Sequence, residues 1–235
     1  MKKEFTIKEI AAELDHSLLR PQMSVDEVTE GCLLAKELGC VTVCVKPCDV
    51  ALAHKLLEGS DVLTTTVIGF PHGGATTKSK VFETEDAIDN GAVEVDMVMN
   101  IGHFLSGEYD FVQDEIAQVA AAAHKKGAIL KVILETCYLT EEQIVKACEL
   151  CHNAKADFVK TSTGYGTEGA TTAGLKIMVE NSNGMRVKAA GGVRTLDATL
   201  DMMAIGASRC GTSSSKAILE EAKERSVDGK LYVEC

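Results

Sequence analysis

Short runs of β-branched residues alternate with amphipathic stretches along the chain, which predicts strands and helices in turn. Eight runs predict strands, at residues 13–19, 40–47, 62–70, 92–101, 128–136, 157–164, 185–192 and 207–214. Amphipathic patterns between them predict helices, among them those at residues 24–39, 75–91, 111–127, 140–156 and 194–206. Four of these end in glycine, the usual C-terminal stop of a helix: Gly39, Gly91, Gly127 and Gly206. Strands that alternate with helices imply parallel strands joined by right-handed crossovers.

The number of strand and helix units decides between the two common parallel architectures. Eight units in 235 residues match a (β/α)8 TIM barrel, which typically has roughly 250 residues. A doubly wound sheet usually has fewer strands and a glycine-rich turn after the first, but the first turn here, HSLLRPQMS, has no glycine. We therefore predict an α/β protein with a single TIM-barrel domain, residues 1–235, and expect its chemistry at the carboxyl ends of the strands.

Period-two alternation within the strands indicates which side chains face the barrel axis. In the strand at 92–101, one parity packs against the helices: Val93, Val95, Met97, Met99 and Ile101. The other parity faces the axis: Glu94, Asp96, Val98 and Asn100. Two further sets each share a face: Ile129, Lys131, Ile133 and Glu135, and Phe158, Lys160 and Ser162. Because a barrel interior is ordinarily branched and apolar, inward Asp and Lys side chains depart from normal packing.

Composition and charge narrow the function classes. The chain is 46% hydrophobic and 25% charged, as in an ordinary folded protein with a sizeable core. A formal net charge of -11 and a sequence pI of about 5.0 argue against broad nucleic-acid binding and against attachment to an anionic membrane. The acidic balance leaves a local anion site open, because backbone N–H groups bind phosphate without a basic residue.

Nine scattered cysteines, in a chain without a signal peptide or a membrane-spanning run, predict reduced thiols and a cytoplasmic protein. The stretch CELCH, Cys148 to His152, matches the pattern of c-type haem attachment. It lies in a helical pattern where Cys148 and Cys151 are one turn apart, and no second pair of zinc ligands is evident nearby. We predict an ordinary helix here, and neither a metal nor an organic cofactor.

Two lysines in similar short strands are the strongest candidates for chemistry: Lys160 in DFVKTSTG and Lys188 in RVKAAGG. Each alone is compatible with a structural ion pair or with a side chain that extends to the barrel rim. At a comparable height on successive strands, however, two ammonium groups repel, so one of them loses its proton more easily. A neutral amine is the nucleophile that condenses with a carbonyl. The pair therefore indicates amine-based catalysis, and the residues alone leave open which lysine is the nucleophile.

Two other inward charged residues accompany the lysine pair. Asp96 has two possible roles. It could simply neutralise the lysines, or it could transfer protons through a water molecule while a C–C bond is made or broken. We expect Lys131 to pair with an inward carboxylate such as Asp96 or Glu94 and to act as a supporting residue.

Glycine-rich segments follow the last three predicted strands: STGYG, AAGGVRT and RCGTSSS. Each precedes a helix, so backbone N–H groups and the hydroxyls of Ser213 and Ser214 form a plausible phosphate site. Phosphate sites after strands seven and eight are common in this barrel. Any one of these glycines is also explained by a tight turn, so the prediction depends on the three segments meeting at one rim.

A resemblance to a known family extends over nearly the whole chain. The motifs LDHSLL, VCVKP, TVIGFPHG, EVDMVMNIG, KVILET, FVKTSTGYG, VKAAGGVRT and RCGTSSS, in this order, resemble the deoxyribose-phosphate aldolase family. The resemblance implies a class I, Schiff-base aldolase on a TIM barrel. It implies cleavage of 2-deoxy-D-ribose 5-phosphate to acetaldehyde and D-glyceraldehyde 3-phosphate, in deoxyribose catabolism. It also implies a homodimer or homotetramer.

The resemblance also implies roles for individual residues. It places the Schiff-base lysine at Lys160, the lysine that perturbs it and aids proton transfer at Lys188, and the proton-relay aspartate at Asp96. Phosphate contacts fall on Gly164, Gly191, Gly192, Gly211, Ser213 and Ser214. Asp15, Ser17 and Cys44 line the site in relatives.

The chain departs from the family pattern at two places. Some relatives have a phosphate-binding lysine directly after the STG glycine, where this chain has Tyr165. Some relatives end in a tyrosine that reaches the active site, whereas Tyr232 lies three residues before the terminus here, and we assign it no role. Two alternatives stay open: a Schiff-base lyase for another phosphorylated sugar or keto acid, and a non-catalytic phosphosugar-binding protein.

Overall fold

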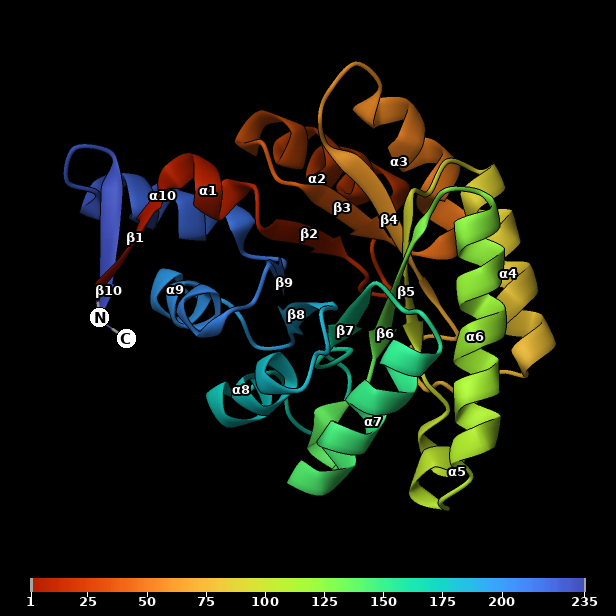
Figure 1. Ribbon diagram of the computed structural model, residues 1–235. Coiled ribbons are helices and arrows are strands. Elements are labelled where there is room, and N and C mark those ends of the chain that lie inside the picture. The colour runs from red at the N-terminus through yellow and green to blue at the C-terminus, as the bar shows by residue number, and fades with distance from the viewer. Residues whose placement is uncertain (1, 235) are drawn as a thin grey trace.

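A closed barrel of eight parallel strands forms the centre of the protein (Figure 1). The structure is a computed structural model and describes residues 2–234. The barrel strands are β2 (Leu14–Leu18), β3 (Thr42–Val45), β4 (Leu63–Ile68), β5 (Glu94–Val98), β6 (Ile129–Ile133), β7 (Phe158–Lys160), β8 (Arg186–Ala190) and β9 (Arg209–Thr212). They pair in chain order, and β2 closes the barrel on β9 with Leu14 opposite Cys210. All eight predicted strands and the (β/α)8 fold are confirmed.

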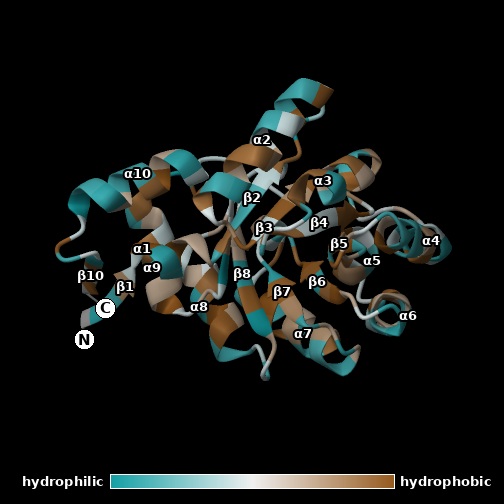
Figure 2. Ribbon diagram, turned by 90° about the horizontal axis from the view of Figure 1, so that it is seen from above, coloured by the Kyte–Doolittle hydropathy of each residue, from teal (hydrophilic) through white to brown (hydrophobic). Residues whose placement is uncertain are grey.

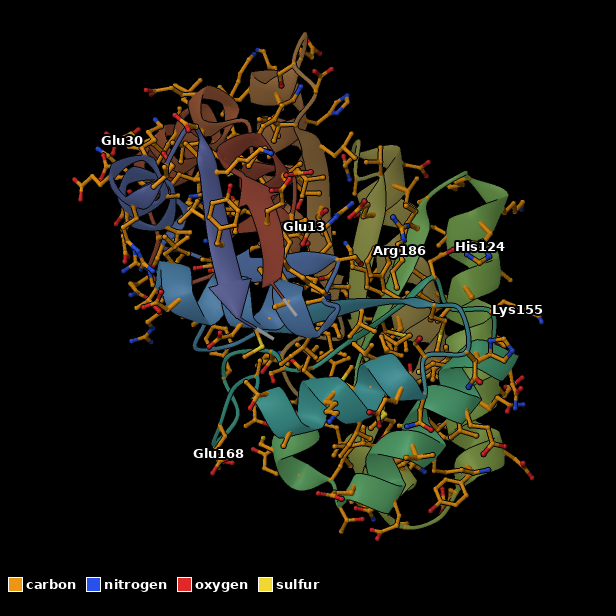
Figure 3. All side chains as sticks on the ribbon, turned by 60° about the vertical axis from the view of Figure 1, so that its left-hand side comes forward. Glu13, Glu30, His124, Lys155, Glu168 and Arg186 are labelled. Carbon is orange, nitrogen blue, oxygen red and sulfur yellow. The ribbon has the colours of Figure 1, made fainter. Side chains whose placement is uncertain are left out.

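Helices surround the barrel and cover its outer face (Figure 1). They are α1 (Ile7–Ala11), α2 (Val25–Leu38), α3 (Val50–Leu57), α4 (Thr77–Asp89), α5 (Ile101–Leu105), α6 (Tyr109–Lys125), α7 (Glu141–Asn153), α8 (Thr172–Glu180), α9 (Leu196–Ile205) and α10 (Ser215–Arg225). Short 3-10 turns occupy Pro47–Asp49 and Thr136–Tyr138. Figure 2 shows hydrophilic positions gathered on the outer sides of the helices. In Figure 3, charged side chains such as Glu30 and Glu168 extend into solvent.

The predicted helices begin and end where the capping residues allow. Ser24 caps α2 in a capping box with Glu27, and Thr140 caps α7 in the same way with Gln143. Helix α2 ends at Gly39, whose left-handed backbone favours glycine. The CELCH stretch lies within α7 as predicted, with Cys148 and Cys151 both buried free thiols.

The apolar core fills the layer between the strands and the helices. Val95, Met97 and Met99 are fully buried there, as the alternation predicted. The prediction was wrong at the end of this strand, which stops at Val98 rather than at residue 101. The Asn100 side chain accepts a hydrogen bond from the His103 backbone N–H and caps α5, so helix formation wins over strand extension.

A second, two-stranded sheet joins the two ends of the described chain. β1 (Lys2–Thr6) pairs antiparallel with β10 (Lys230–Glu234), beside the barrel rather than in it (Figure 1). Sequence patterns did not identify these strands, because each is short and neither lies between helical patterns. Within residues 2–234, no helix has the length and apolarity needed to cross a membrane.

Candidate active site

A cavity of about 270 Å³ opens at the carboxyl ends of the barrel strands. It collects ten of the predicted residues: Asp15, Ser17, Cys44, Lys160, Gly164, Lys188, Gly191, Gly192, Gly211 and Ser213. Asp96 and Lys131 are fully buried and do not line the cavity. Asp96 forms ion pairs with Lys131 and with Lys160, which does line it. Ser214 is outside the lining, and its backbone N–H donates to the Thr212 hydroxyl at 2.9 Å. The last three strands therefore meet at one rim, as the phosphate-site prediction required.

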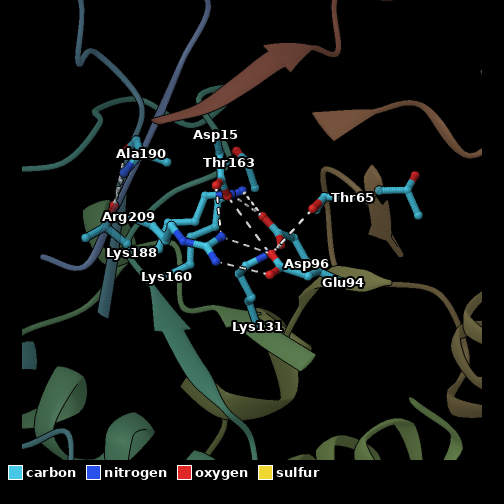
Figure 4. A network of polar contacts seen from close by, with 12 residues as sticks. Asp15, Thr65, Glu94, Asp96, Lys131, Lys160, Thr163, Lys188, Ala190 and Arg209 are labelled. Atoms are coloured by element: carbon cyan, nitrogen blue, oxygen red, sulfur yellow. Dashed lines mark hydrogen bonds and ion pairs between the residues drawn. The ribbon is translucent and has the colours of Figure 1, made fainter. Parts of the chain in front are cut away.

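The lysine pair lies at the floor of this cavity. Parallel pairing of β7 with β8 places Lys160 directly opposite Lys188, and the two side chains are 4% and 1% exposed. Their Nζ atoms donate to the same oxygen, Oδ2 of Asp96, at 2.7 Å and 2.8 Å (Figure 4). One carboxylate oxygen therefore holds both amines close together.

The two lysines differ in how readily they lose a proton. Burial lowers the pKa of Lys160; the bond to Asp96 opposes this and the charge of Lys188 reinforces it. Burial also disfavours charged Lys188, but Asp15 and Asp96 outweigh it and hold its pKa above the ordinary value. From the sequence we expected Lys188 to be the cause of a lowered Lys160 pKa, whereas burial is the larger cause. The opposite directions indicate Lys160 as the amine that becomes neutral.

Asp96 stays ionised although it is fully buried. Burial raises the pKa of this carboxyl, but Lys131, Lys160 and Lys188 together hold it well below its usual range. The Lys131 amine contacts Asp96 Oδ1 at 2.8 Å and Glu94 Oε2 at 2.5 Å, so it pairs with both carboxylates named as its candidates. The predicted pairing of Lys131 with an inward carboxylate is therefore confirmed.

Sequence reasoning missed one charged residue in the barrel interior, Arg209 on β9. Its guanidinium contacts Asp15 Oδ1 at 3.1 Å and both oxygens of Glu94 at 3.1 Å and 3.2 Å. The signal was present, because alternation in ASRCGTSS places Arg209 on the same face as Gly211, which lines the cavity. With Arg209, Lys188 and Lys131 nearby, the pKa of Asp15 falls to about 2 despite burial.

Cys44 and Ser17 line the cavity from β3 and β2. Burial raises the pKa of the Cys44 thiol to about 11, with the charge of Asp96 adding to the effect, so the thiol is neutral near pH 7. Ser17 is partly exposed at the mouth.

Two neighbouring glycines on the rim have different reasons to be glycine. A Cβ on Gly191 would lie 3.0 Å from the Gly169 Cα, so close packing of the loops after β7 and β8 requires its absence. A Cβ on Gly192 would meet nothing within 4 Å. Close packing between the loops therefore accounts for Gly191, while Gly192 leaves its backbone open beside the cavity.

Eight further lining residues had no assigned role, and three of them carry charged or phenolic side chains: Arg20, Tyr165 and Arg194. Among residues 2–234, no carboxylate lies within ion-pair distance of Arg20 or Arg194. The Tyr165 hydroxyl donates to the Leu19 carbonyl at 2.8 Å, and its ring packs edge-on against Phe70 at 5.4 Å. Tyr165 therefore links the loop after β7 to the segment that carries Arg20.

The fold and the site together define a (β/α)8-barrel enzyme with a buried, carboxylate-linked lysine pair at the carboxyl ends of its strands. Residues 8–221 match the sequence profile of the DeoC/LacD family aldolases. The chain belongs to this family of aldolases.

Individual relatives agree with the family assignment. The chain is 46% identical over 228 residues to a deoxyribose-phosphate aldolase from Caldanaerobacter subterraneus subsp. tengcongensis, covering 96% of this chain and 98% of the relative. It is similar to the crystal structure of a putative deoxyribose-phosphate aldolase from Coccidioides immitis, with a TM-score of 0.90 and 40% identity over 94% of this chain and 88% of that one. It also resembles the deoxyribose phosphate aldolase from Aeropyrum pernix, with a TM-score of 0.87 and 30% identity over 93% of this chain and 92% of that one.

Proposed function

We propose that this aldolase reversibly cleaves 2-deoxy-D-ribose 5-phosphate to D-glyceraldehyde 3-phosphate and acetaldehyde, in the breakdown of deoxyribose. The relatives named above support the substrate. The observation that carries the mechanism is the shared Asp96 oxygen, which holds two buried amines of opposite protonation tendency at the cavity floor. Lys160 is the nucleophile, Lys188 assists proton transfer and Asp96 relays protons.

The first step forms an imine between the substrate and Lys160. The neutral amine attacks the C1 aldehyde of the open-chain sugar, and the carbinolamine oxygen leaves as water after it has gained a proton. Lys188 is charged and its amine contacts the same Asp96 oxygen as Lys160, so it is placed to give that proton. The product is a protonated imine, which withdraws electrons from C2.

The second step breaks the C2–C3 bond. The C3 hydroxyl loses its proton through a water molecule to ionised Asp96, the C2–C3 electron pair moves into the imine, and glyceraldehyde 3-phosphate leaves. The remaining enamine takes up a proton at C2, and water then releases acetaldehyde and regenerates the Lys160 amine. In this proposal the protonated imine is the electron sink, so the step uses neither a metal nor an organic cofactor.

The glycine-rich segments after the last three barrel strands hold the phosphate in this proposal. The predicted contacts are Gly164, Gly191, Gly192, Gly211, Ser213 and, less directly, Ser214. The guanidinium groups of Arg20 and Arg194, which have no carboxylate partner among residues 2–234, supply positive charge in place of the lysine that some relatives carry at the position of Tyr165. Binding of this remote group helps to orient the reacting carbons.

Borohydride reduction in the presence of acetaldehyde tests the proposal. We expect an ethyl adduct on Lys160, located by peptide mass spectrometry, and loss of adduct and cleavage in Lys160→Ala. Lys216→Ala, on the exposed surface of α10, is the matched control and should behave as the unsubstituted protein. An adduct elsewhere, or full activity in Lys160→Ala, would contradict the assignment. Cleavage rates for several phosphorylated sugars and keto acids distinguish this substrate from those of other Schiff-base lyases.

We also propose a cytoplasmic homodimer or homotetramer whose partners are small phosphosugars rather than nucleic acid or membranes. The A. pernix relative is described as having a unique tetrameric structure, which supports self-association. The eight described cysteines are free thiols, which supports a reducing compartment. Sedimentation analysis should give a mass of two or four times the 25.0 kDa chain.

A further inference from the structure

Six charged side chains in the barrel interior form a closed ring in which positive and negative groups alternate (Figure 4). In order, the ring contains Asp15, Lys188, Asp96, Lys131, Glu94 and Arg209, which contacts Asp15 again. The side chains come from β2, β8, β5, β6 and β9, and all are less than 10% exposed. Each member contacts an oppositely charged neighbour on either side.

Lys160 is attached to this ring but is not a member of it. Its amine contacts Asp96, which the ring amines of Lys131 and Lys188 already contact. The ring holds three carboxylates and three cations, so it is neutral without Lys160. A protonated Lys160 would therefore be a seventh, surplus charge in a buried site, where an uncompensated charge is costly.

We propose that Glu94 and Arg209, neither of which lines the cavity, are positioning residues that complete the ring and so leave Lys160 as the amine that gives up its proton. This inference rests on the proposed Schiff-base role of Lys160. It extends that role to two residues on the far side of the ring, which act only through Asp15, Lys131 and their neighbours. Together with burial, the charge balance of the whole ring, rather than the one neighbouring lysine, sets the protonation state of Lys160.

The other groups that face the ring are neutral, except for one carboxyl that is partly ionised. Strand β3 supplies the neutral thiol of Cys44, and β4 supplies Thr65, which donates to Glu94 at 3.4 Å. At the start of the barrel, burial raises the pKa of Glu13 to about 7 although Arg209 opposes it, so this carboxyl is partly neutral near pH 7. The aromatic ring of Phe158 lies near two guanidinium groups, with its centroid 4.0 Å from Cζ of the exposed Arg186 and 5.6 Å from Cζ of Arg209. The lowered pKa of Lys160, outside the ring, and the raised pKa of Lys188, within it, agree with this charge balance.

Removing a cation from the ring and removing a carboxylate from it should shift the pH at which Lys160 loses its proton in opposite directions. In Arg209→Met the ring has two cations for three carboxylates, so protonated Lys160 restores neutrality and keeps its proton to higher pH. In Glu94→Gln the ring has three cations for two carboxylates, so Lys160 loses its proton at lower pH. In the double variant two cations face two carboxylates, and Lys160 is again surplus. A purely structural role for these residues predicts no such reversal and no recovery.

The experiment measures the pH dependence of kcat/KM and of the rate of borohydride-trapped ethyl adduct on Lys160. We expect the acid limb of both profiles to move to higher pH in Arg209→Met, with adduct formation on that limb slowed roughly tenfold. It should move to lower pH in Glu94→Gln and return toward the original position in the double variant. Arg209→Lys keeps the charge and is the control, with an unshifted profile. Circular dichroism establishes that each variant is folded.

The outcomes separate this inference from the proposed function. Absence of an adduct on Lys160 in the unsubstituted protein defeats both. An adduct there, with unmoved acid limbs in the folded variants or with both single variants shifted the same way, defeats the ring inference alone. If Arg209→Met does not fold, Glu94→Gln still tests the proposal. An acid limb that stays in place or moves to higher pH in Glu94→Gln overturns it.

Discussion

Lys160 shows how a residue that is rarely buried becomes tolerable in a barrel interior. Its side chain is 4% exposed, and its amine contacts a carboxylate that two other lysines also contact. The site therefore does not compensate a permanent charge at this position, and a neutral amine is the less costly form. The same feature that makes Lys160 unusual as a core residue makes it suitable as a nucleophile.

At the same scale, neighbouring rim glycines should respond differently to alanine. Both Gly191 and Gly192 have positive φ, of 81° and 79°, so alanine strains either backbone by roughly 1–2 kcal/mol. Gly191→Ala also brings a Cβ to 3.0 Å from the Gly169 backbone, while Gly192→Ala meets open space. We expect thermal unfolding to show a clearly lower Tm for Gly191→Ala than for Gly192→Ala. Equal Tm values would show that the close loop packing does not matter.

At the scale of elements, strand register decides which functional groups meet. Pairing of β7 with β8 places the two lysines opposite each other, and pairing of β5 with β6 places Asp96 opposite Lys131. A shift by one residue would turn these side chains outward into the apolar layer. The loops that follow these strands then complete the site, with Tyr165 joining the loop after β7 to Leu19.

The loop arginines should affect phosphorylated and non-phosphorylated substrates differently. Arg20→Gln and Arg194→Gln each remove a guanidinium that lines the cavity without a carboxylate partner. Because charged hydrogen bonds contribute about 1.5–3 kcal/mol, we expect KM for deoxyribose 5-phosphate to rise roughly tenfold or more, with little change for deoxyribose. Steady-state kinetics with both substrates provides the measurement.

Arg225→Gln, on the surface of α10, is the control for the loop arginines, since its guanidinium contacts Asp197 and Glu221 instead. Equal losses for both substrates in the loop variants would assign the arginines to folding rather than to the phosphate.

The elements were predictable because their patterns are local. The alternation of short strand-like runs with helical patterns predicted every barrel strand, and period-two alternation predicted the inward direction of Asp96 and Lys131. The end of β5 was not predictable from alternation, because Asn100 caps α5 instead of continuing the strand. The sheet formed by β1 and β10 was missed because its partners are separated by almost the whole chain.

At the scale of the whole molecule, closure of β2 on β9 brings the first and last barrel strands together. This contact places Asp15 beside Arg209, 194 residues away, and closes the charged ring. It also places His16 against Ser215 at the start of α10, with the His16 Nδ1 3.0 Å from the Ser215 hydroxyl. Closure therefore couples the site to the stability of the barrel.

The buried His16 should make the protein lose stability in mild acid. Burial lowers the pKa of His16 from 6.5 to about 4, so the folded state resists protonation more than the unfolded state does. The stability from this group is complete above pH 6.5 and is lost as pH falls toward 4, by up to about 3 kcal/mol.

Urea denaturation at pH 7 and pH 4 measures the His16 contribution, with His16→Gln as the comparison that removes it. A variant that loses as much stability over this range as the unsubstituted protein would contradict the assignment.

The sequence by itself determined the barrel, the inward charged residues and, through resemblance, the aldolase family, because periodicity and motif order are properties of neighbouring residues. Only the tertiary structure decided how the charges balance. Arg209 joins Asp15 and Glu94 across the barrel, and the additional carboxylate of Asp15 beside Lys188 makes the pKa values of Lys160 and Lys188 differ although both lysines are buried and their strands look alike. Ion pairing and desolvation depend on what surrounds a side chain in space, and that environment exists only when the barrel is closed.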